Sequence, residues 1–282
     1  MIIQWFPGHM NKALKVLEEQ LKLVDVVIYV LDARAPFSCL NPEFSKRVFK
    51  KPIIYVLNKC DLIEQKTANK FKEKFTSNNS SCIILNSLAT QSAKVLIPEI
   101  EKLTKEKVEK YAKKGVSVPV RAVVIGVPNC GKSTLINNLC GKYKAITGNK
   151  AGVTRGKQWV RINERIEVLD MPGTLWPSFD DNKVAHNLAY IGSIRDEVVE
   201  KTELCFDFIK DILEINPNCF EERYGIEIAE QDEVIDVYHK ICESRNYYLK
   251  KSEFDYDRCA NAVIDDFRKG KLGKICLEGK YE

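Results

Sequence analysis

The stretch G-V-P-N-C-G-K-S, from Gly126 to Ser133, is the strongest indication of the fold of this chain. It has the form G-x-x-x-x-G-K-S, in which successive backbone N–H groups turn inward around the α- and β-phosphates of a nucleotide. Lys132 is expected to reach the β- and γ-phosphates, and the Ser133 hydroxyl to bind Mg²⁺. An apolar run precedes the loop and a helix-compatible segment follows it, as the motif requires. The predicted nucleotide contacts of this loop are Asn129, Cys130, Gly131, Lys132, Ser133 and Thr134.

A second motif, N-K-C-D, runs from Asn58 to Asp61 directly after another apolar run. The Asp61 carboxylate can accept two hydrogen bonds, from N1–H and from the exocyclic amine of guanine, whereas adenine would leave it unpaired. Asn58 is expected to hold the neighbouring loops together, and Lys59 to lay its stem along the base. The alternative is an ordinary strand-to-helix turn with Asp61 as the N-cap. Asn86 and Ser87, at the end of the next apolar run, fit a shorter loop against the base.

The base-reading motif precedes the phosphate loop, which reverses the order found in a Ras-like domain. Short apolar runs, each followed by a polar segment compatible with a helix, indicate parallel strands that are buried on both faces. We therefore expect an α/β fold, a circularly permuted Ras-like P-loop GTPase domain whose mostly parallel sheet is flanked by helices. The apolar runs with this wiring are 26–31, 53–57 and 82–85, and further strands are expected at 121–125, 158–162 and 166–169.

A third motif, D-M-P-G, runs from Asp170 to Gly173 and fits the element that responds to the γ-phosphate. Asp170 is expected to hold Mg²⁺ through a water molecule, and the Gly173 N–H to sense the γ-phosphate. Thr154 is the candidate for a second hydroxyl on Mg²⁺, because its loop is expected to close over the metal. The alternative for Thr154 is a plain surface loop. Ordering of the D-M-P-G loop by GTP is expected to pull on the region that follows it.

Beyond Pro177 only helical spacing of apolar residues remains, which predicts a small all-α C-terminal domain. The predicted division is a permuted G domain over residues 1–177 and a helical domain over 178–282 that binds RNA or the ribosome. The basic segment 267–274 suits phosphate backbones, and the alternative for it is a solvated tail.

Net charge, the length of apolar runs and the cysteine pattern indicate which partners and which compartment to expect. The 282 residues carry a net charge of +5, which permits an RNA partner without demanding one. The longest apolar run, 26–31, is too short to span a bilayer, and the first ten residues lack the pattern of a signal peptide. None of the ten cysteines stands in a C-x-x-C pair, which indicates a reduced compartment. We expect a cytoplasmic protein with no membrane partner.

Further stretches extend a family likeness over almost the whole chain, among them W-F-P-G-H-M at 5–10, D-A-R-A-P at 32–36 and G-K-L-G at 270–273. With these, the chain resembles the circularly permuted GTPases of ribosome assembly, most closely the ribosome biogenesis GTPase A family. The resemblance implies a switch that hydrolyses GTP to GDP and phosphate in late assembly of the large (50S) ribosomal subunit. It implies slow turnover alone, faster turnover on the particle, Mg²⁺ as cofactor and rRNA as the contact surface. We expect the free protein to be a monomer.

The resemblance also assigns roles to single residues. Where many GTPases place a water-orienting Gln, this chain has Thr174, which is too short for that task. His9 is the replacement that the resemblance offers, so the predicted catalytic set is His9, Lys132 and Thr154. From sequence alone, His9 after Pro-Gly is more typical of a turn residue. Asn129 resembles the Asn that lets related GTPases bind K⁺ beside the phosphates, and the alternative is that it only shapes the loop.

Two other functions stay open at this point. A P-loop ATPase or kinase would accept ATP as well as GTP, and Asp61 argues against it. A nucleotide-regulated RNA-binding assembly module with little catalysis would bind ribosomal particles whether or not nucleotide is present.

Overall fold

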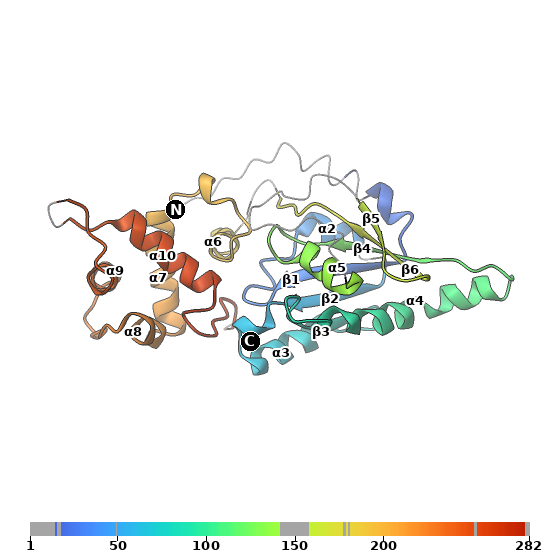
Figure 1. Cartoon of the computed structure of the whole chain (residues 1–282), viewed down its shortest axis with the longest axis horizontal. Coiled ribbons are helices and arrows are strands. Elements are labelled where there is room, and N and C mark those ends of the chain that lie inside the picture. The colour runs from blue at the N-terminus through green and yellow to red at the C-terminus, as the bar shows by residue number, and fades with distance from the viewer. Residues whose placement is uncertain are drawn as a thin grey trace.

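The structure, a computed structural model, is built around a six-stranded sheet in the order β3-β2-β1-β4-β6-β5 (Figure 1). Neighbouring strands are parallel, except that β5 runs antiparallel to β6. The strands are β1 (Val26–Asp32), β2 (Ile53–Asn58), β3 (Ser80–Ile84), β4 (Val120–Ile125), β5 (Gln158–Arg161) and β6 (Ile166–Asp170). The structure describes residues 15, 18–48, 50–141, 158–176, 179, 181–250 and 253–279.

β1 is the buried centre of the sheet. All seven of its residues are buried, because β2 and β4 flank it and helices cover both faces, and this explains its continuous apolar run. β3 begins two residues earlier than its apolar run predicts. Ser80 and Ser81 pair with Ile53 and Ile54 at the edge of the sheet, where polar side chains are tolerated.

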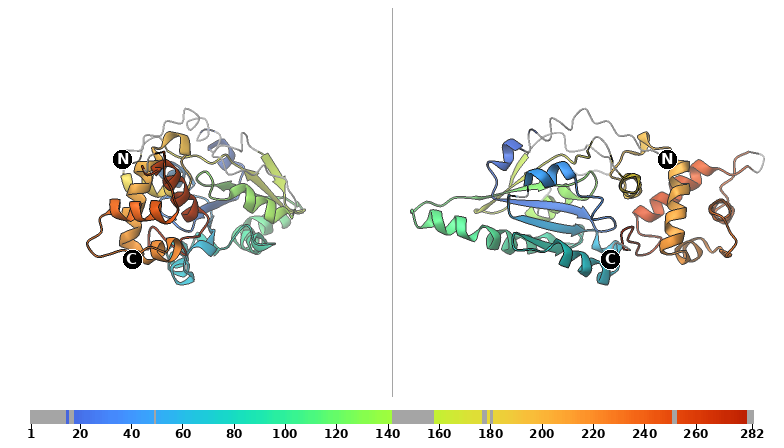
Figure 2. Two further views of the ribbon diagram at one scale, coloured as in Figure 1. Left: turned by 60° about the vertical axis from the view of Figure 1, so that its left-hand side comes forward. Right: turned by 180° about the vertical axis from the view of Figure 1, so that it is seen from behind.

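Helices flank the sheet as the sequence predicts. α2 (Pro42–Val48) lies on the face opposite α5 (Lys132–Cys140) (Figures 1 and 2). α3 (Gln65–Phe75) packs against β3, and α4 (Leu96–Ala112) packs along β1 and β4 and extends beyond the sheet.

The strand order confirms the circular permutation. The first three strands of the chain form one half of the sheet, the last three form the other half, and β1 and β4 join them. Because β1, β2 and β4 point the same way, the loops after β2 and β4 leave at the same edge of the sheet. This edge brings the N-K-C-D motif and the phosphate loop together.

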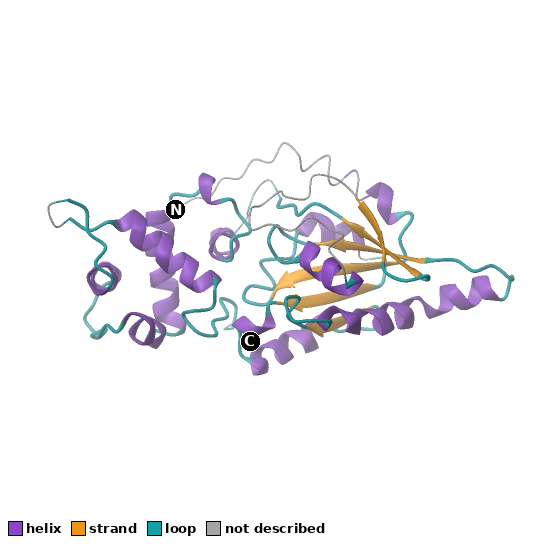
Figure 3. Cartoon of the chain, viewed as in Figure 1, coloured by secondary structure: helices purple, strands orange, loops and turns teal. Residues whose placement is uncertain are grey.

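The described residues after Trp176 form helices that lie to one side of the sheet (Figure 3). Their core contains the buried side chains of Phe208, Val237, Val263 and Phe267. The helical C-terminal region is therefore confirmed, whereas its boundary at residue 177 stays a prediction. Its helices are α6 (Asn182–Tyr190), α7 (Lys201–Ile215), α8 (Asn218–Tyr224), α9 (Val234–Ser244) and α10 (Tyr256–Arg268), with the short helix η3 (Asp196–Val198) before α7. Among the described residues, no helix has both the length and the apolar character that crossing a membrane requires.

The segment after α10 returns to the sheet domain. The Leu277 N–H donates to the Arg34 carbonyl at 2.8 Å. The buried Glu278 carboxylate accepts hydrogen bonds from the N–H groups of Phe37 (2.7 Å) and Ser38 (2.8 Å). Through residue 279, the chain after α10 is thus docked, and Leu272, within the basic segment 267–274, is buried, so the alternative of a solvated tail is wrong for that segment, while its contact with phosphate backbones stays a prediction.

Candidate nucleotide-binding site

The phosphate loop joins β4 to α5 along a path that requires glycine at two points. Gly126 has a φ of 148°, and a Cβ there would lie 2.4 Å from the Val30 carbonyl oxygen. Gly131 has a φ of 100°, and a Cβ there would lie 2.1 Å from the amide nitrogen of Asn58. The loop therefore rests directly on β1 and on the N-K-C-D motif. Gly131 is the N-cap of α5, so the positive end of that helix points at the loop.

Lys132 opens α5 and is buried. Its Nζ donates to the carbonyl oxygens of Gly126 (3.1 Å) and Val127 (2.8 Å), which holds the ammonium across the loop. A Cβ on Gly173 would lie 2.7 Å from this Nζ and 2.7 Å from the Cα of Pro128. The D-M-P-G motif thus abuts the phosphate loop at a position where no larger residue fits.

Asp170, at the end of β6, is buried beside the first turn of α5. Its Oδ2 accepts a hydrogen bond from the Ser133 hydroxyl at 3.1 Å, whereas its Oδ1 is buried with no hydrogen-bond partner among the described residues. Burial raises the pKa of Asp170, and the Lys132 ammonium and the Ser133 hydroxyl partly offset that rise. A buried carboxylate oxygen beside a hydroxyl suits a hydrated Mg²⁺, which prefers oxygen ligands and keeps several waters. Ser133 and Asp170 therefore fit the predicted metal.

Asn58 joins three loops at the nucleotide edge. It is 1% exposed, its amide nitrogen donates to the Cys130 carbonyl at 2.7 Å, and its Oδ1 accepts from the Ser87 N–H at 2.9 Å. The structure thus places Asn58 between the phosphate loop and the loop after β3. This is the arrangement that the sequence predicts for it.

Lys59 has a left-handed backbone, with a φ of 59°, and lies between two acceptors. Its Nζ donates to the Asn129 carbonyl at 2.8 Å and to the Asp32 carboxylate at 2.7 Å. Asp32 is fully buried, and Arg34 also donates to its two oxygens, at 2.9 and 2.7 Å. Burial favours the neutral acid, but Arg34 and Lys59 together hold the pKa of Asp32 well below its usual range. The roles of Asp32 and Arg34 could not be predicted from residue types or spacing. In the sequence, their D-A-R-A-P stretch contributes only to the family resemblance.

The other residues predicted to contact the base, Asp61 and Asn86, lie in the loops next to Asn58 and Lys59. Asp61 is exposed within the short helix η1 (Cys60–Leu62). The N-caps of η1 and α3 are Lys59 and Glu64, so the alternative that makes Asp61 an N-cap is wrong. Asn86 shapes the loop after β3 by accepting a hydrogen bond from the Leu88 N–H at 2.8 Å.

The remaining predicted residues of the phosphate loop differ in exposure. Cys130 is fully buried, and Thr134 is half-buried in the first turn of α5.

The phosphate loop also contacts the helical region. Asn129 has a φ of 58°, and its amide nitrogen donates to the Gly192 carbonyl, just after α6, at 2.7 Å. The Ser193 hydroxyl donates to the Pro128 carbonyl at 2.8 Å. Sequence reasoning missed these contacts, because no motif marks Gly192 or Ser193.

Comparisons with known proteins agree with this geometry. Residues 121–240 match the family model described as 50S ribosome-binding GTPase. Ribosome biogenesis GTPase A of Bacillus cereus is 37% identical over 283 residues, which cover 100% of this chain and 95% of that protein. This chain belongs to the ribosome biogenesis GTPase A family.

Other members of the ribosome biogenesis GTPase A family and solved structures extend the match. The protein of that name from Bacillus licheniformis is 36% identical over 279 residues, which cover 99% of this chain and 98% of that protein. The crystal structure of GNP-bound YlqF from T. maritima has a TM-score of 0.65 and 26% identity, and the match covers 94% of this chain and 97% of that one. As a member of this GTPase family, the chain binds guanine nucleotide, hydrolyses GTP and uses Mg²⁺ as the typical metal.

Two residues of the predicted catalytic set, His9 and Thr154, lie outside the described residues. The roles that the family resemblance and the sequence give to them stay predictions.

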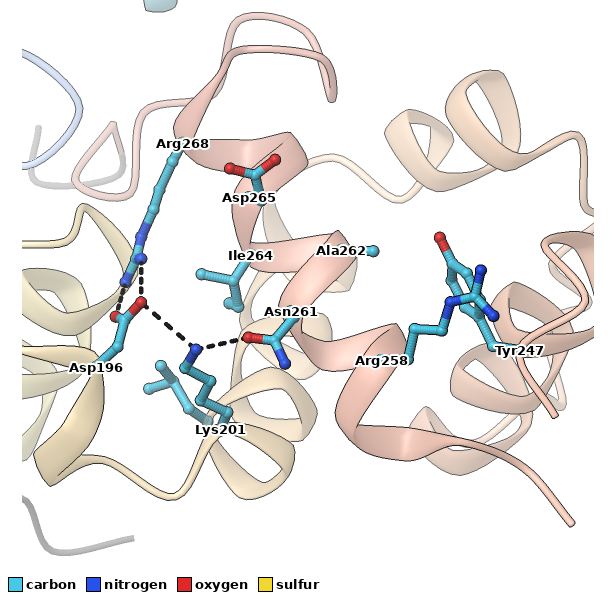
Figure 4. Close-up of a pocket in the computed structure, with 10 residues that line it drawn as sticks. Asp196, Lys201, Tyr247, Arg258, Asn261, Ala262, Ile264, Asp265 and Arg268 are labelled. Carbon is cyan, nitrogen blue, oxygen red and sulfur yellow. Dashed lines mark hydrogen bonds and ion pairs between the residues drawn. The ribbon is translucent and has the colours of Figure 1, made fainter. Parts of the chain in front are cut away.

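A separate pocket of about 500 Å³ lies in the helical region, between α7 and α10 (Figure 4). Asp196 accepts hydrogen bonds from Arg268 at 3.0 and 2.8 Å and lies 3.6 Å from the Lys201 Nζ. That Nζ also donates to the Asn261 Oδ1 at 2.6 Å. These charged groups of the pocket pair with one another, and together they fix the side chain of Arg268.

Proposed function

We propose that this chain is a GTP-operated switch in the assembly of the large ribosomal subunit, slow alone and stimulated by the ribosomal particle. The observation that carries the proposal is the Asn58 bridge, which joins an N-K-C-D loop to a G-K-S phosphate loop in one site. The description of the matching family model, 50S ribosome-binding GTPase, supports the large subunit as the partner.

The proposed roles divide the site between base, phosphates and metal. Asp61 accepts from the guanine edge, and Lys59 lies along the base. Lys132 neutralises the β- and γ-phosphates, and the Gly173 N–H contacts the γ-phosphate. Ser133 and Thr154 bind Mg²⁺ directly, and Asp170 binds it through water. The loop residues Asn86, Ser87, Asn129, Cys130, Gly131 and Thr134 complete the nucleotide contacts.

Slow intrinsic turnover follows from the residue after Gly173. Thr174 stands there, and its hydroxyl is buried with no hydrogen-bond partner among the described residues. Without a Gln to orient the attacking water, we expect turnover toward about 10⁻⁴ per second, the scale of unassisted small GTPases. His9 is proposed to orient that water when the particle is bound.

K⁺ is proposed as a second cation beside the phosphates, held with the help of Asn129. The family resemblance supports this, and Asn129 lies in the phosphate loop with its amide nitrogen on the Gly192 carbonyl at 2.7 Å. Replacing K⁺ by Na⁺ should slow hydrolysis, and Asn129→Ala should remove the difference between the two ions.

The end of α10 and the segment after it are proposed to contact rRNA. Lys269, Lys271 and Lys274 are exposed and pair with Asp265 at 2.7 Å, Asp266 at 3.0 Å and Glu64 at 3.9 Å, respectively. The pairs of Lys269 and Lys274 are exposed on both sides and are worth little, so RNA phosphates can displace them, whereas Lys271 pairs with the buried Asp266. Binding to rRNA should weaken steeply with salt.

The deciding experiment measures GTP hydrolysis in K⁺ buffer by the protein alone, with large subunits and with small subunits. Stimulation by large subunits only, lost in His9→Ala, supports the partner and the catalytic role together. Equal use of ATP would instead favour an ATPase or kinase. Equal binding to ribosomal particles with GTP, with GDP and without nucleotide, together with no stimulation of hydrolysis, would favour an RNA-binding module. Sedimentation of the free protein checks the expected monomer.

A further inference from the structure

Arg34 is a fully buried arginine at the junction of the sheet and the helical region. Its Nε and Nη2 donate to the two oxygens of Asp32 at 2.9 and 2.7 Å, and its backbone N–H donates to Oδ1 at 3.1 Å. The fork geometry fixes the Asp32 carboxylate in place more firmly than a single contact can.

The Asp32 carboxylate in turn fixes Lys59. Oδ2 accepts from the Lys59 Nζ at 2.7 Å, and the same Nζ reaches the Asn129 carbonyl at 2.8 Å. The ammonium of the base-reading loop is therefore held between a buried anion and the phosphate loop. Its place depends on where Arg34 holds Asp32.

The other side of Arg34 faces the end of α10. Its Nη1 donates to the carbonyl oxygens of Phe267 (3.4 Å) and Arg268 (3.5 Å), and its guanidinium lies 4.9 Å from the centre of the Phe267 ring. The C-terminal end of a helix carries partial negative charge, so a buried cation stabilises this contact. One guanidinium thus serves both Asp32 and α10.

A second route leaves the same helix end. Arg268, the last residue of α10, donates to the carbonyls of Ala189 (2.8 Å) and Tyr190 (3.0 Å) at the end of α6, and Asp196 holds it from the other side (Figure 4). A Cβ on Gly192 would lie 3.2 Å from the Arg268 guanidinium, so α6 and α10 meet closely there.

The two routes close on one residue of the phosphate loop. Asn129 gives its carbonyl to Lys59 at 2.8 Å and its amide nitrogen to the Gly192 carbonyl at 2.7 Å. The base-reading loop, the phosphate loop and the end of α10 are therefore linked in a ring of hydrogen bonds.

We infer that Arg34 is a positioning residue for guanine-nucleotide binding, acting through Asp32 on Lys59, and that it couples nucleotide binding to the docking of α10. The inference rests on the proposed nucleotide site. In this arrangement GDP and GTP both stabilise the docked helix, because both need Lys59 and neither route includes a γ-phosphate contact. Loosening of α10 should in turn weaken binding of either nucleotide, by linkage.

The test is a double-mutant cycle on the affinity of the full chain for fluorescent GDP. Arg34→Met keeps an apolar stem against Phe267 but removes every guanidinium donor, and we expect GDP binding to weaken about tenfold. Lys59→Met should weaken it by a similar or larger factor. Because Arg34 acts through Lys59, the double variant should bind about as weakly as Lys59→Met alone. Multiplication of the two single losses would overturn the inference.

A matched control separates this role from a general effect on α10. Arg223 donates from Nε to the Asp266 carboxylate on α10 at 2.8 Å, outside the ring of hydrogen bonds. Arg223→Met should leave GDP affinity within twofold of wild type. A loss equal to that of Arg34→Met would show that any damage to α10 weakens binding, and would overturn the inference.

A conservative variant covers the case in which Arg34→Met does not fold. Arg34→Lys keeps the charge, but one ammonium cannot grip both Asp32 oxygens and the α10 carbonyls together. It should show a smaller loss of GDP affinity that again disappears in the Lys59→Met background. Wild-type affinity in Arg34→Lys, or a loss that persists in that background, would overturn the inference.

A second readout reports docking directly. In wild type, bound GDP should slow amide hydrogen exchange across the last turn of α10, and in Arg34→Met or Arg34→Lys this protection should shrink. Equal protection in the variants would contradict the coupling. A wild-type chain that binds no guanine nucleotide would remove the proposed function and this inference together. If wild type binds GDP normally but the losses of affinity in Arg34→Met and Lys59→Met multiply in the double variant, the inference fails and the proposed function is kept.

Discussion

Replacing Asn58 with alanine tests how the nucleotide site is held together. The change removes two buried hydrogen bonds, to the Cys130 carbonyl at 2.7 Å and from the Ser87 N–H at 2.9 Å. Each leaves a backbone group that must find water or stay unpaired, at a cost of about 1–3 kcal/mol. Partial relaxation brings the expected sum to about 3 kcal/mol in the free energy of unfolding. GDP can bind only when the loops are in their native arrangement, so binding must supply the free energy that restores them. A cost of about 2.7 kcal/mol weakens the affinity for GDP about 100-fold.

The assay is a fluorescent-GDP titration with urea unfolding of the same samples. Asn138→Ala is the matched control, because Asn138 also holds the loop after β3. It donates to the carbonyls of Ser87 (3.0 Å) and Ala89 (2.6 Å) and accepts from the Ala93 N–H (3.0 Å), without touching the phosphate loop.

Asn138→Ala should therefore lower stability comparably but weaken GDP binding far less than Asn58→Ala. Asn58→Asp keeps an acceptor for Ser87 and sets an oxygen against the Cys130 carbonyl, so it should still lose most of the affinity. Near wild-type GDP affinity in Asn58→Ala, or an equal loss in Asn138→Ala, would show that Asn58 does not hold the nucleotide site together.

Three further predictions follow from buried ionisable groups. Asp170→Asn removes the carboxylate proposed to hold hydrated Mg²⁺. In wild type, adding Mg²⁺ to EDTA-treated protein should raise the affinity for GTP, and in the variant this gain should be at least tenfold smaller. An unchanged gain would exclude the proposed role of Asp170. Burial raises the pKa of Glu278 above its ordinary 4.5, so its contribution to stability is present below that value and is lost as the pH rises through the folded value. The unfolding free energy of wild type minus that of Glu278→Gln should therefore fall between pH 4.5 and pH 7, and a flat difference would count against it. Burial also raises the pKa of the Cys130 thiol, which should react with iodoacetamide far more slowly in the folded chain than in urea, as peptide mapping would show.

The parts of the site that could be predicted are contiguous in sequence. Gly126 and Gly131 encode the path of the phosphate loop, because only glycine takes those φ values beside β1 and Asn58. The linking role of Asn58 could also be predicted, since its motif ends a buried strand next to that loop. The central strands followed from continuous apolar runs, which buried parallel strands require.

The contacts that could not be predicted join residues far apart in the chain. Arg34 and Phe267 are separated by 233 residues, and no periodicity shows that the end of α10 returns to β1. The docking of Glu278 could not be predicted either, because its partners, the N–H groups of Phe37 and Ser38, lie 241 and 240 residues earlier in the chain. The antiparallel pairing of β5 with β6 depends on a connection too short for a crossover, which runs of apolar residues do not reveal.

The position of β1 beside β4 has a consequence during synthesis. Ribosomes release the chain from its N-terminus, so β1, β2, β3 and the whole of α4 emerge before β4 does. Until then, the backbone N–H and C=O groups of β1 that will pair with β4 stay open to other chains. A nascent chain can also gain no protection from nucleotide until α5 has followed. The interval between the release of α4 and of α5 is therefore when this protein should depend most on chaperones.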